Sequence, residues 1–345
     1  RMPQMNQTGF ARFAAVADLP SGWRGGVVAI GNFDGVHRGH QVVLGQALAE
    51  AKQRDAPALA LTFEPHPRTL FRPEEPVFRL TPAPLKAGLL AAIGFDAVVE
   101  QRFDQTFAGQ DAEQFVQHVL VGGLGITHAV TGFDFHFGRN RQGDPAYLKA
   151  SGARHGFAVT LVEAYGDEDG KIISSSRIRG LLVEGEVAAA AGLLGYRYTV
   201  EAEVVRGKQL GRTLGFPTAN MALPPQTALR HGIYAVRLRR ADGSLHDGVA
   251  SFGRRPTVDD NGAPLLETFV FDFDGDLYGE TCRVSLFGAR TAPRRGRGEG
   301  VAVGCAPAVG AGWRDRLLTR APDPGCADMR MRVSVKGCFS LLRLR

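Results

Sequence analysis

His37 and His40 stand three residues apart in the segment His37-Arg38-Gly39-His40. Two imidazoles at this spacing share one face of a first helical turn, where they could donate hydrogen bonds to a triphosphate. The N-terminus of a helix adds free N–H groups and a partial positive charge, and both favour bound phosphate. The alternative for an isolated pair of this kind is a surface histidine beside a capping histidine. A zinc site would need further ligands at a fitting spacing, and the sequence offers none.

Three further polar segments directly follow apolar runs that predict strands. They are 62–67 (Thr-Phe-Glu-Pro-His-Pro), 132–144, which opens with Gly-Phe-Asp-Phe, and 173–179 (Ile-Ser-Ser-Ser-Arg-Ile-Arg). In open α/β sheets, ligands bind outside the carboxyl ends of the strands. We therefore expect these segments and the histidine pair to converge on one crevice. Serine hydroxyls at a helix start, with an arginine three residues on, would form a second phosphate clamp.

A second group of candidate residues begins in a glycine-rich segment, 207–220. Glycines permit close backbone approach to phosphate, but the spacing is one residue short of a Walker A loop and Arg212 stands in place of its lysine. Thr218 and Asn220 could present oxygens to Mg²⁺. Glu267, which we expect at the start of a strand, is a candidate general base. The alternatives are a glycine-rich hairpin loop and a solvated edge carboxylate.

Alternating strands and helices must position the histidine pair and its neighbours. Apolar runs predict strands at 27–30, 58–63, 97–99, 128–131 and 158–162, and periodic apolar residues predict helices at 41–54, 85–93 and 112–120. This alternation predicts an open parallel α/β sheet of the Rossmann-like kind over residues 10–186.

The pattern changes near residue 190. A helical segment, 186–194, leads into strand-like segments separated by turn residues, at 200–206, 233–239, 248–252, 267–273 and 282–287. They predict a compact antiparallel β-barrel over residues 187–287.

Composition excludes several classes of protein. The 345 residues are 44% hydrophobic and 22% charged, a profile typical of two globular domains without disulfide support. No apolar run approaches a membrane span, and the sequence has no secretory signal. Four cysteines without a CxxC pair indicate neither a disulfide scaffold nor a zinc site. We expect a cytoplasmic protein with no membrane partner.

Positive charge is concentrated in the tail, residues 288–345. This segment has 11 Arg and one Lys against three Asp and one Glu, whereas the whole chain carries only +6. The rest of the chain is therefore close to neutral and gives no reason to expect nucleic acid. The abrupt gain of Gly, Arg, Ala and Cys favours a change of reading frame, and the alternative is a genuine basic extension that binds RNA. We expect little packed structure over 289–330.

Four motifs in order resemble those of the nucleotidylyltransferase superfamily. They are GNFDGVHRGH, TFEPHP, GFDF followed by FG, R and GD, and ISSSRIR. They are most similar to the FMN adenylyltransferase module of the bacterial bifunctional riboflavin kinase/FAD synthetase family. The resemblance implies that His37 and His40 hold the ATP phosphates and stabilise departing pyrophosphate, with Arg179, Ser175 and Ser176 as a clamp. It further implies nucleotide contacts from Asn32 and Asp34, and flavin-side contacts from Asp134, Phe135 and Arg141. His136 stands where the family has arginine.

Four further segments resemble the riboflavin kinase module of the same family, namely residues 207–220, 231–235, 248–257 and 267–279. The resemblance implies that Thr218 and Asn220 bind Mg²⁺ with ATP, and that Glu267 deprotonates the ribityl hydroxyl of riboflavin. It also implies that a phosphate-covering loop supplies Gly207, Lys208, Gly211 and Arg212. The two modules together imply one sequence of small-molecule reactions, riboflavin to FMN and FMN to FAD, each consuming ATP.

Several alternatives stay open. The resemblance stops near Phe287, where family members continue into an acidic helix, so the kinase half could be impaired and the protein an FAD synthetase only. A nucleotidylyltransferase for another acceptor would have no use for the Phe-Pro-Thr-Ala-Asn motif. The alternative of a basic RNA-binding protein is supported by the tail alone. A reductase with bound FAD would need a GxGxxG loop after the first strand, and this sequence has none there.

Overall fold

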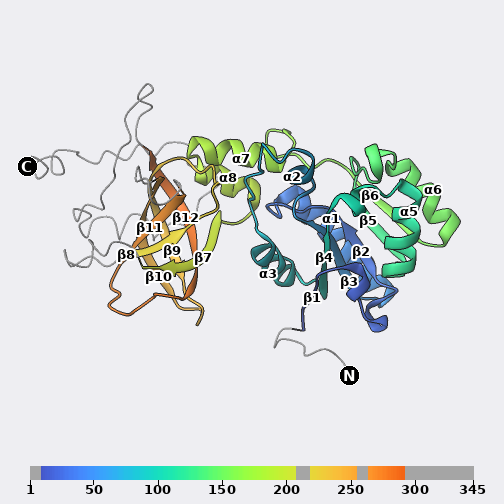
Figure 1. Ribbon diagram of the computed structural model, residues 1–345, viewed down its shortest axis with the longest axis horizontal. Helices are drawn as coiled ribbons and strands as arrows, with labels where there is room; N and C mark the ends of the chain where they lie inside the picture. Colours follow the sequence, from blue (N-terminus) through green and yellow to red (C-terminus); the bar gives the residue numbers. More distant parts are fainter. Residues whose placement is uncertain (1–8, 207–217, 255–262, 292–345) are drawn as a thin grey trace, which may run out of the picture. The chain divides into compact units, whose positions relative to one another are not determined.

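The structure is a computed structural model that describes residues 9–206, 218–254 and 263–291 (Figure 1). Contacts divide the chain into two compact units, with the main boundary between Tyr198 and Thr199. Among the described residues, no helix is both long enough and apolar enough to cross a membrane.

A six-stranded parallel sheet forms the centre of the first unit, in the order β1-β4-β3-β2-β5-β6. Its strands are β1 (Ala11–Phe13), β2 (Val27–Ile30), β3 (Ala58–Glu64), β4 (Ala97–Arg102), β5 (His128–Gly132) and β6 (Ala158–Val162). The chain builds outward from β2 to β4 on one side, then crosses to β5 and β6 on the other. The order therefore reverses between β2 and β5, and a ligand crevice is expected at their carboxyl ends. The predicted parallel α/β sheet is confirmed, and the short β1 was not predicted.

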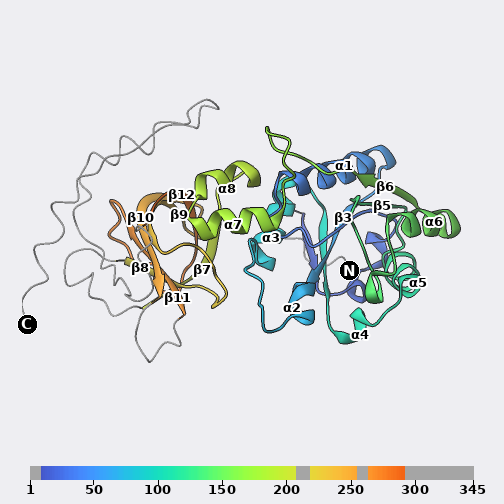
Figure 2. The same cartoon turned by 90° about the horizontal axis from the view of Figure 1, so that it is seen from above.

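Helices cover both faces of this sheet (Figures 1 and 2). They are α1 (Arg38–Arg54), α2 (Pro67–Phe71), α3 (Ala83–Ile93), α4 (Gln105–Ala108), α5 (Ala112–Gln114), the π-helical η3 (Phe115–Leu124), α6 (Pro145–His155), α7 (Ser175–Glu184) and α8 (Val187–Leu194), with 3₁₀ turns η1 (Val16–Asp18), η2 (Ser21–Trp23) and η4 (Arg139–Arg141). One buried core packs α1 and α3 against the sheet, and the other packs α5, η3 and α6 against its opposite face.

The first helix begins earlier than its apolar spacing predicts. Apolar residues start the periodic pattern after Gln41, but α1 begins at Arg38 because the ring of His37 caps it by accepting a hydrogen bond from the backbone N–H of His40. Likewise, the helical segment predicted to end at residue 120 continues through η3 to Leu124.

A closed antiparallel barrel forms the second unit, in the order β10-β11-β8-β7-β12-β9. The strands are β7 (Thr199–Val205), β8 (Thr218–Ala222), β9 (Gly232–Arg239), β10 (Leu245–Arg254), β11 (Pro264–Val270) and β12 (Thr281–Thr291). Strand β11 alternates buried and partly exposed residues along its length, as expected when one face of a strand lines a barrel interior. The predicted β-barrel is confirmed.

Three expectations for the barrel need correction. Strand β8 was not predicted, because its residues were assigned to the glycine-rich segment. Glu267 does not begin a strand: β11 starts at Pro264, so Glu267 lies in its middle. Strand β12 pairs with β9 as far as Thr291, so the expected loss of packed structure does not begin at 289. Residues 292–330 lie outside the described residues.

Candidate active site

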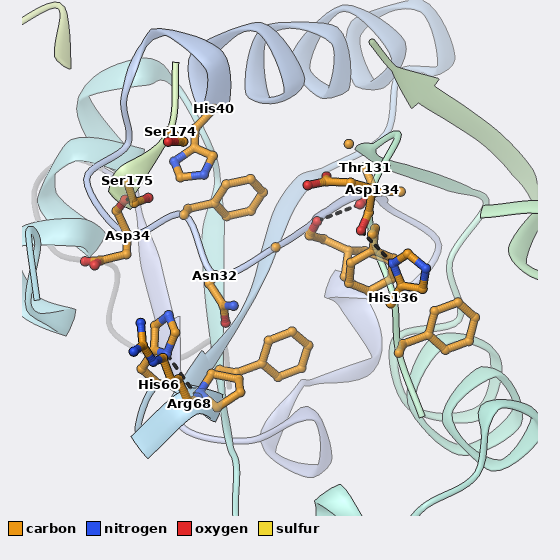
Figure 3. Close-up of a pocket in the computed structure, with 18 of the residues that line it drawn as sticks. Asn32, Asp34, His40, His66, Arg68, Thr131, Asp134, His136, Ser174 and Ser175 are labelled. Atoms are coloured by element: carbon orange, nitrogen blue, oxygen red, sulfur yellow. Dashed lines mark hydrogen bonds between the residues drawn. The ribbon is translucent and has the colours of Figure 1, made fainter. Parts of the chain in front are cut away.

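A cavity of about 1290 Å³ opens at the carboxyl edge of the sheet in the first unit. A drug-sized ligand occupies a pocket of about 300–1,000 Å³, so this cavity has room for more than one substrate. Its lining includes every residue expected in the first site, namely Asn32, Asp34, His37, His40, Asp134, Phe135, Arg141, Ser175, Ser176 and Arg179. The expected convergence of the four segments on one crevice is confirmed. Figure 3 shows His40 and Ser175 on one side of the cavity, Asp134 on another, and Asn32 between them.

The two histidine rings of the first turn stack on each other. Their centroids lie 3.6 Å apart and their planes differ by 17°. The small residue between them permits this approach, since a Cβ on Gly39 would lie 3.2 Å from Nδ1 of His37. Nδ1 of His37 accepts a hydrogen bond from the backbone N–H of His40, so the neutral ring carries its proton on Nε2. That N–H is the donor His37 can offer to a ligand.

Both rings are held neutral near pH 7. Burial lowers the pKa of His37 to about 4, against the raising effect of nearby Asp34. Burial also lowers the pKa of His40 well below its usual value, with further lowering from His37, Lys86 and Arg179. Nδ1 of His40 is buried and has no hydrogen-bond partner among the residues that the structure describes. A neutral imidazole can still donate one N–H to an oxyanion, and an anionic ligand would favour protonation.

The carboxylate of Asp34 binds other groups of the protein rather than standing free in the cavity. The residue is only 2% exposed, and its carboxylate accepts hydrogen bonds from the backbone N–H groups of Leu80 and Thr81, each at 3.0 Å. It also forms an ion pair with Arg179. These bonds make Asp34 the anchor of a neighbouring arginine, and its expected contact with nucleotide stays a prediction.

Arg179, in the middle of α7, is fixed by two acceptors. Its Nε donates to the carbonyl oxygen of Phe78 at 2.6 Å, and its Nη2 donates to Asp34. A guanidinium has five N–H groups in a planar fork, so the others can serve an oxyanion. The hydroxyl of Ser175 donates its only proton to the carbonyl oxygen of Asp34 at 2.7 Å. In this arrangement the hydroxyl proton of Ser175 is engaged, and its part in the clamp on phosphate stays a prediction.

The expected flavin-side residues lie after β5. Asp134, His136 and Arg141 are exposed at this side of the cavity, and Phe135 is partly buried. Nδ1 of His136 lies 2.8 Å from the carbonyl oxygen of Asp134 and 3.0 Å from Nη2 of Arg141. A protonated Nδ1 donates to the carbonyl oxygen, whereas a bare Nδ1 accepts from the arginine. His136, at the position where the resemblance led us to expect an arginine, thus contacts Arg141.

A chain of phenylalanine rings forms one wall of the cavity. Neighbouring rings lie 5.1–6.2 Å apart, and Phe135 stacks on Phe137 with planes 18° apart. We call this set the phenylalanine wall; its members are Phe63, Phe71, Phe103, Phe107, Phe115, Phe135 and Phe137. Sequence reasoning singled out only Phe135 as a site residue. Phe63 and Phe137 lie inside motifs that it used, but neither was assigned a role. Such a wall suits a flat, largely apolar ring system.

Residues expected in the second site lie on one face of the barrel. Asn220 on β8 is directly opposite Glu267 on β11, and Thr218 lies two residues before Asn220. Directly opposed residues share a face, as do residues two apart on one strand, so all three point the same way. Met221 follows Asn220 and Leu266 precedes Glu267, so the side chains of these two neighbours point to the opposite face of the sheet. Both are fully buried in the interior, so Thr218, Asn220 and Glu267 point outward from the barrel.

Ser251 extends this row and was missed by the sequence reading. It lies opposite Glu267 on the other side, on β10, and is 6% exposed. The side-chain Nδ2 of Asn220 donates to the carbonyl oxygen of Thr218 at 3.1 Å, which leaves the amide oxygen as an acceptor. The predicted loop residues Gly207, Lys208, Gly211 and Arg212 lie outside the described residues.

Two protein-family models match this chain, one for each unit. The FAD synthetase model matches residues 19–177, and the riboflavin kinase model matches residues 194–291.

Curated relatives match across both units. The bifunctional riboflavin kinase/FMN adenylyltransferase of Escherichia coli K12 is 39% identical over 262 residues, covering 76% of this chain and 83% of the relative. The protein of the same name from Bacillus subtilis 168 is 35% identical over 274 residues, with the same coverage. A solved structure from Streptococcus pneumoniae, described as a macrolide-efflux protein, matches with a TM-score of 0.70 and 28% identity, covering 84% of this chain and 93% of that one.

Proposed function

This chain belongs to the bifunctional riboflavin kinase/FMN adenylyltransferase family, and from that membership we propose which part of the chain carries out each reaction. The enzyme phosphorylates riboflavin to FMN and adenylates FMN to FAD. We assign adenylyl transfer to residues 10–186, in the cavity of the first unit. We assign phosphoryl transfer to residues 187–287, on the outer face of the barrel.

One observation carries the first assignment. The stacked His37 and His40 and the anchored Arg179 line the same cavity as the phenylalanine wall. Oxyanion donors on one side suit a triphosphate, and a wall of rings on another suits the isoalloxazine ring of FMN. The volume of about 1290 Å³ allows both substrates to be bound together.

Adenylyl transfer then needs positioning and charge stabilisation rather than a protein nucleophile. A phosphate oxygen of FMN attacks the α-phosphorus of ATP, and the bond to the bridging oxygen of pyrophosphate breaks. Negative charge grows on the leaving pyrophosphate, where N–H groups of Arg179, His37 and His40 stabilise it. Asp34 keeps the Arg179 guanidinium in place through the ion pair and thereby limits its reorganisation. On the flavin side, Asp134, Phe135 and Arg141 contact FMN.

The outer row of the barrel supports the second assignment. Glu267 lies directly opposite Asn220, and we propose that Glu267 takes the proton from the ribityl hydroxyl of riboflavin while that oxygen attacks the γ-phosphorus of ATP. ADP leaves and FMN is formed.

We further propose that Mg²⁺ is held beside this carboxylate. Thr218 and Asn220 supply neutral oxygens on one face, and the Asn220 amide oxygen is left as an acceptor by the bond from Nδ2. A hard cation of this size prefers a few protein oxygens together with phosphate oxygens and water. When bound, Mg²⁺ would neutralise charge on the ATP phosphates. The chain's own residues orient the hydroxyl and accept its proton.

A kinase-impaired form of the enzyme is not favoured. The riboflavin kinase model matches as far as residue 291, and the barrel is closed through β12. Because both reactions consume ATP, we propose the cytoplasm as the compartment.

A product assay by chromatography tests the function. The full chain would be incubated with Mg-ATP and either riboflavin or FMN. Formation of FAD from either substrate, with FMN as the intermediate from riboflavin, supports both assignments. FAD from FMN but no product from riboflavin would overturn the kinase assignment. No reaction with either substrate, in protein shown to be folded by circular dichroism, would overturn both.

A further inference from the structure

Lys86 on α3 is completely buried and bonded to the backbone of the site. Its Nζ donates to the carbonyl oxygen of Asn32 at 3.2 Å and to Oε1 of Glu64 at 2.8 Å. Asn32 lines the cavity, but neither Lys86 nor Glu64 is among the described residues that do so. The ammonium group therefore acts behind the wall of the site rather than on a substrate.

An ion-pair network continues from Lys86 to Arg179, which we propose binds the ATP phosphates. Glu64 accepts two hydrogen bonds from Arg79, both at 2.8 Å. Nε of Arg79 lies 3.5 Å from Asp34, and Asp34 in turn holds Arg179. Five charged side chains thus connect α3, the end of β3, the turn after β2 and α7.

The charge of this network is unbalanced. Lys86, Arg79 and Arg179 contribute three positive charges, and Glu64 and Asp34 contribute two negative ones. Excess positive charge beneath the cavity favours an anionic ligand above it. Burial of a lysine is also unfavourable, and an apolar side chain of similar volume would fill the same space without desolvating a charge. Filling space therefore does not explain a lysine at this position.

The turn held by Lys86 needs support from outside. Phe33 and Val36 both have positive φ, at 47° and 37°, which side chains with a Cβ rarely adopt. Such conformations persist where surrounding groups fix them. The bond from Lys86 to the Asn32 carbonyl acts at one end of this turn, and a bond from Gln41 to the Val36 carbonyl at 2.8 Å acts at the other.

We propose that Lys86 is a positioning residue for adenylyl transfer, which acts through Asn32, Glu64 and Arg79 to hold the turn after β2 and Arg179 in the geometry that binds polyphosphate. The inference rests on the proposed assignment of adenylyl transfer to this cavity. Displacement of reacting groups by about 1 Å can cost about a hundredfold in rate, so loss of this hold should affect turnover strongly.

The test compares Lys86→Met and Glu64→Gln with the double variant in the full chain, and Lys149→Met serves as the control. Lys149 is an exposed lysine on α6 outside the network. Initial rates of FAD formation from FMN and ATP give kcat and KM, and riboflavin phosphorylation by the same preparation reports the other site. Circular dichroism melting curves report folding.

We expect Lys86→Met and Glu64→Gln each to lower kcat for FAD formation about tenfold or more, with riboflavin phosphorylation within about twofold of wild type. Because both residues act through one network, the double variant should fall no further than the worse single variant. Lys149→Met should match wild type.

Three outcomes would overturn the inference. Unchanged kcat in folded Lys86→Met and Glu64→Gln, equal loss of both activities, or independent multiplying losses in the double variant would each contradict a positioning role. If Lys86→Met does not fold, the isosteric Glu64→Gln decides alone through its kcat. If wild type and Lys149→Met are folded but make no FAD from FMN, the proposed function fails instead.

Discussion

The imidazole rings of His37 and His40 stack with their centroids 3.6 Å apart, and the ring of His37 caps the helix that carries His40. The cap fixes the tautomer of His37, because the Nδ1 lone pair is committed to the backbone N–H of His40. A phosphate at this helix start would therefore meet a preset donor and the free N–H groups of the first turn.

Replacing His40 by alanine should separate the two activities. The change removes a donor to the leaving pyrophosphate but keeps the His37 cap, since that cap binds the backbone N–H of residue 40. We expect FAD formation from FMN to fall about a hundredfold or more, within the range seen when one preorganised donor is removed, while riboflavin phosphorylation stays near wild type. The measurement is the rate of each reaction in one preparation. His118→Ala, at an exposed position on η3, is the control. Equal loss of both activities in folded protein would contradict two separate sites.

Acid should destabilise the first unit through His37. Its pKa is about 4 in the folded chain and near 6.5 when unfolded, so the unfolded state binds the proton first as pH falls. Stability from this group is complete above pH 6.5 and declines down to about pH 4, by about 3 kcal/mol in total. Melting temperatures measured from pH 7.5 to 4.5 should fall over this window. His37→Gln, which cannot titrate, should show a smaller fall, and an identical pH dependence would contradict the assignment.

The sequence predicted the sheet and the convergence of its motifs well, for a simple physical reason. Buried parallel strands are short continuous apolar runs, and polar residues placed directly after them must meet at one edge. Strand β6 matched its predicted range, 158–162, without error. The barrel strands were harder to bound, because glycine-rich and polar positions blur period-two alternation. Strand β8 was therefore missed, and Glu267 was placed at a strand start instead of in the middle of β11.

Side-chain partners were the part that sequence could not supply. For Asp34, nothing in the sequence indicated that its carboxylate binds the backbone of Leu80 and Thr81 and the side chain of Arg179. Lys86 has the spacing of a buried position, four residues before the fully buried Leu90, and that spacing was the available signal. A lysine is normally assigned to a solvated face, so the charge concealed the pattern.

Replacing one aromatic side chain of the phenylalanine wall by leucine should weaken flavin binding selectively. Phe135 stacks on Phe137 at 5.4 Å and lines the cavity, so Phe135→Leu removes a flat surface while keeping an apolar side chain. Loss of about 1 kcal/mol of aromatic contact corresponds to a rise of about fivefold in the KM for FMN. The KM for ATP in FAD formation should change little, and Phe273→Leu in the second unit should leave both values unchanged. A larger effect on ATP than on FMN would contradict the proposed orientation.

Glu267 provides the sharpest test of the barrel site. Glu267→Gln keeps the size and the register opposite Asn220 but removes the base, so FMN formation from riboflavin should fall about a hundredfold or more. FAD formation from added FMN should persist in the same preparation. Glu203→Gln, an exposed carboxylate on β7, is the matched control.

Proton abstraction and a purely electrostatic role of Glu267 differ in their response to Mg²⁺. If Glu267 accepts the hydroxyl proton, no concentration of Mg²⁺ replaces the base that Glu267→Gln lacks. If the carboxylate only attracts Mg²⁺ toward Asn220 and Thr218, the variant should regain activity at high Mg²⁺ concentration. Full recovery by Mg²⁺ would therefore refute the general base assignment, whereas a low rate at all Mg²⁺ concentrations supports it.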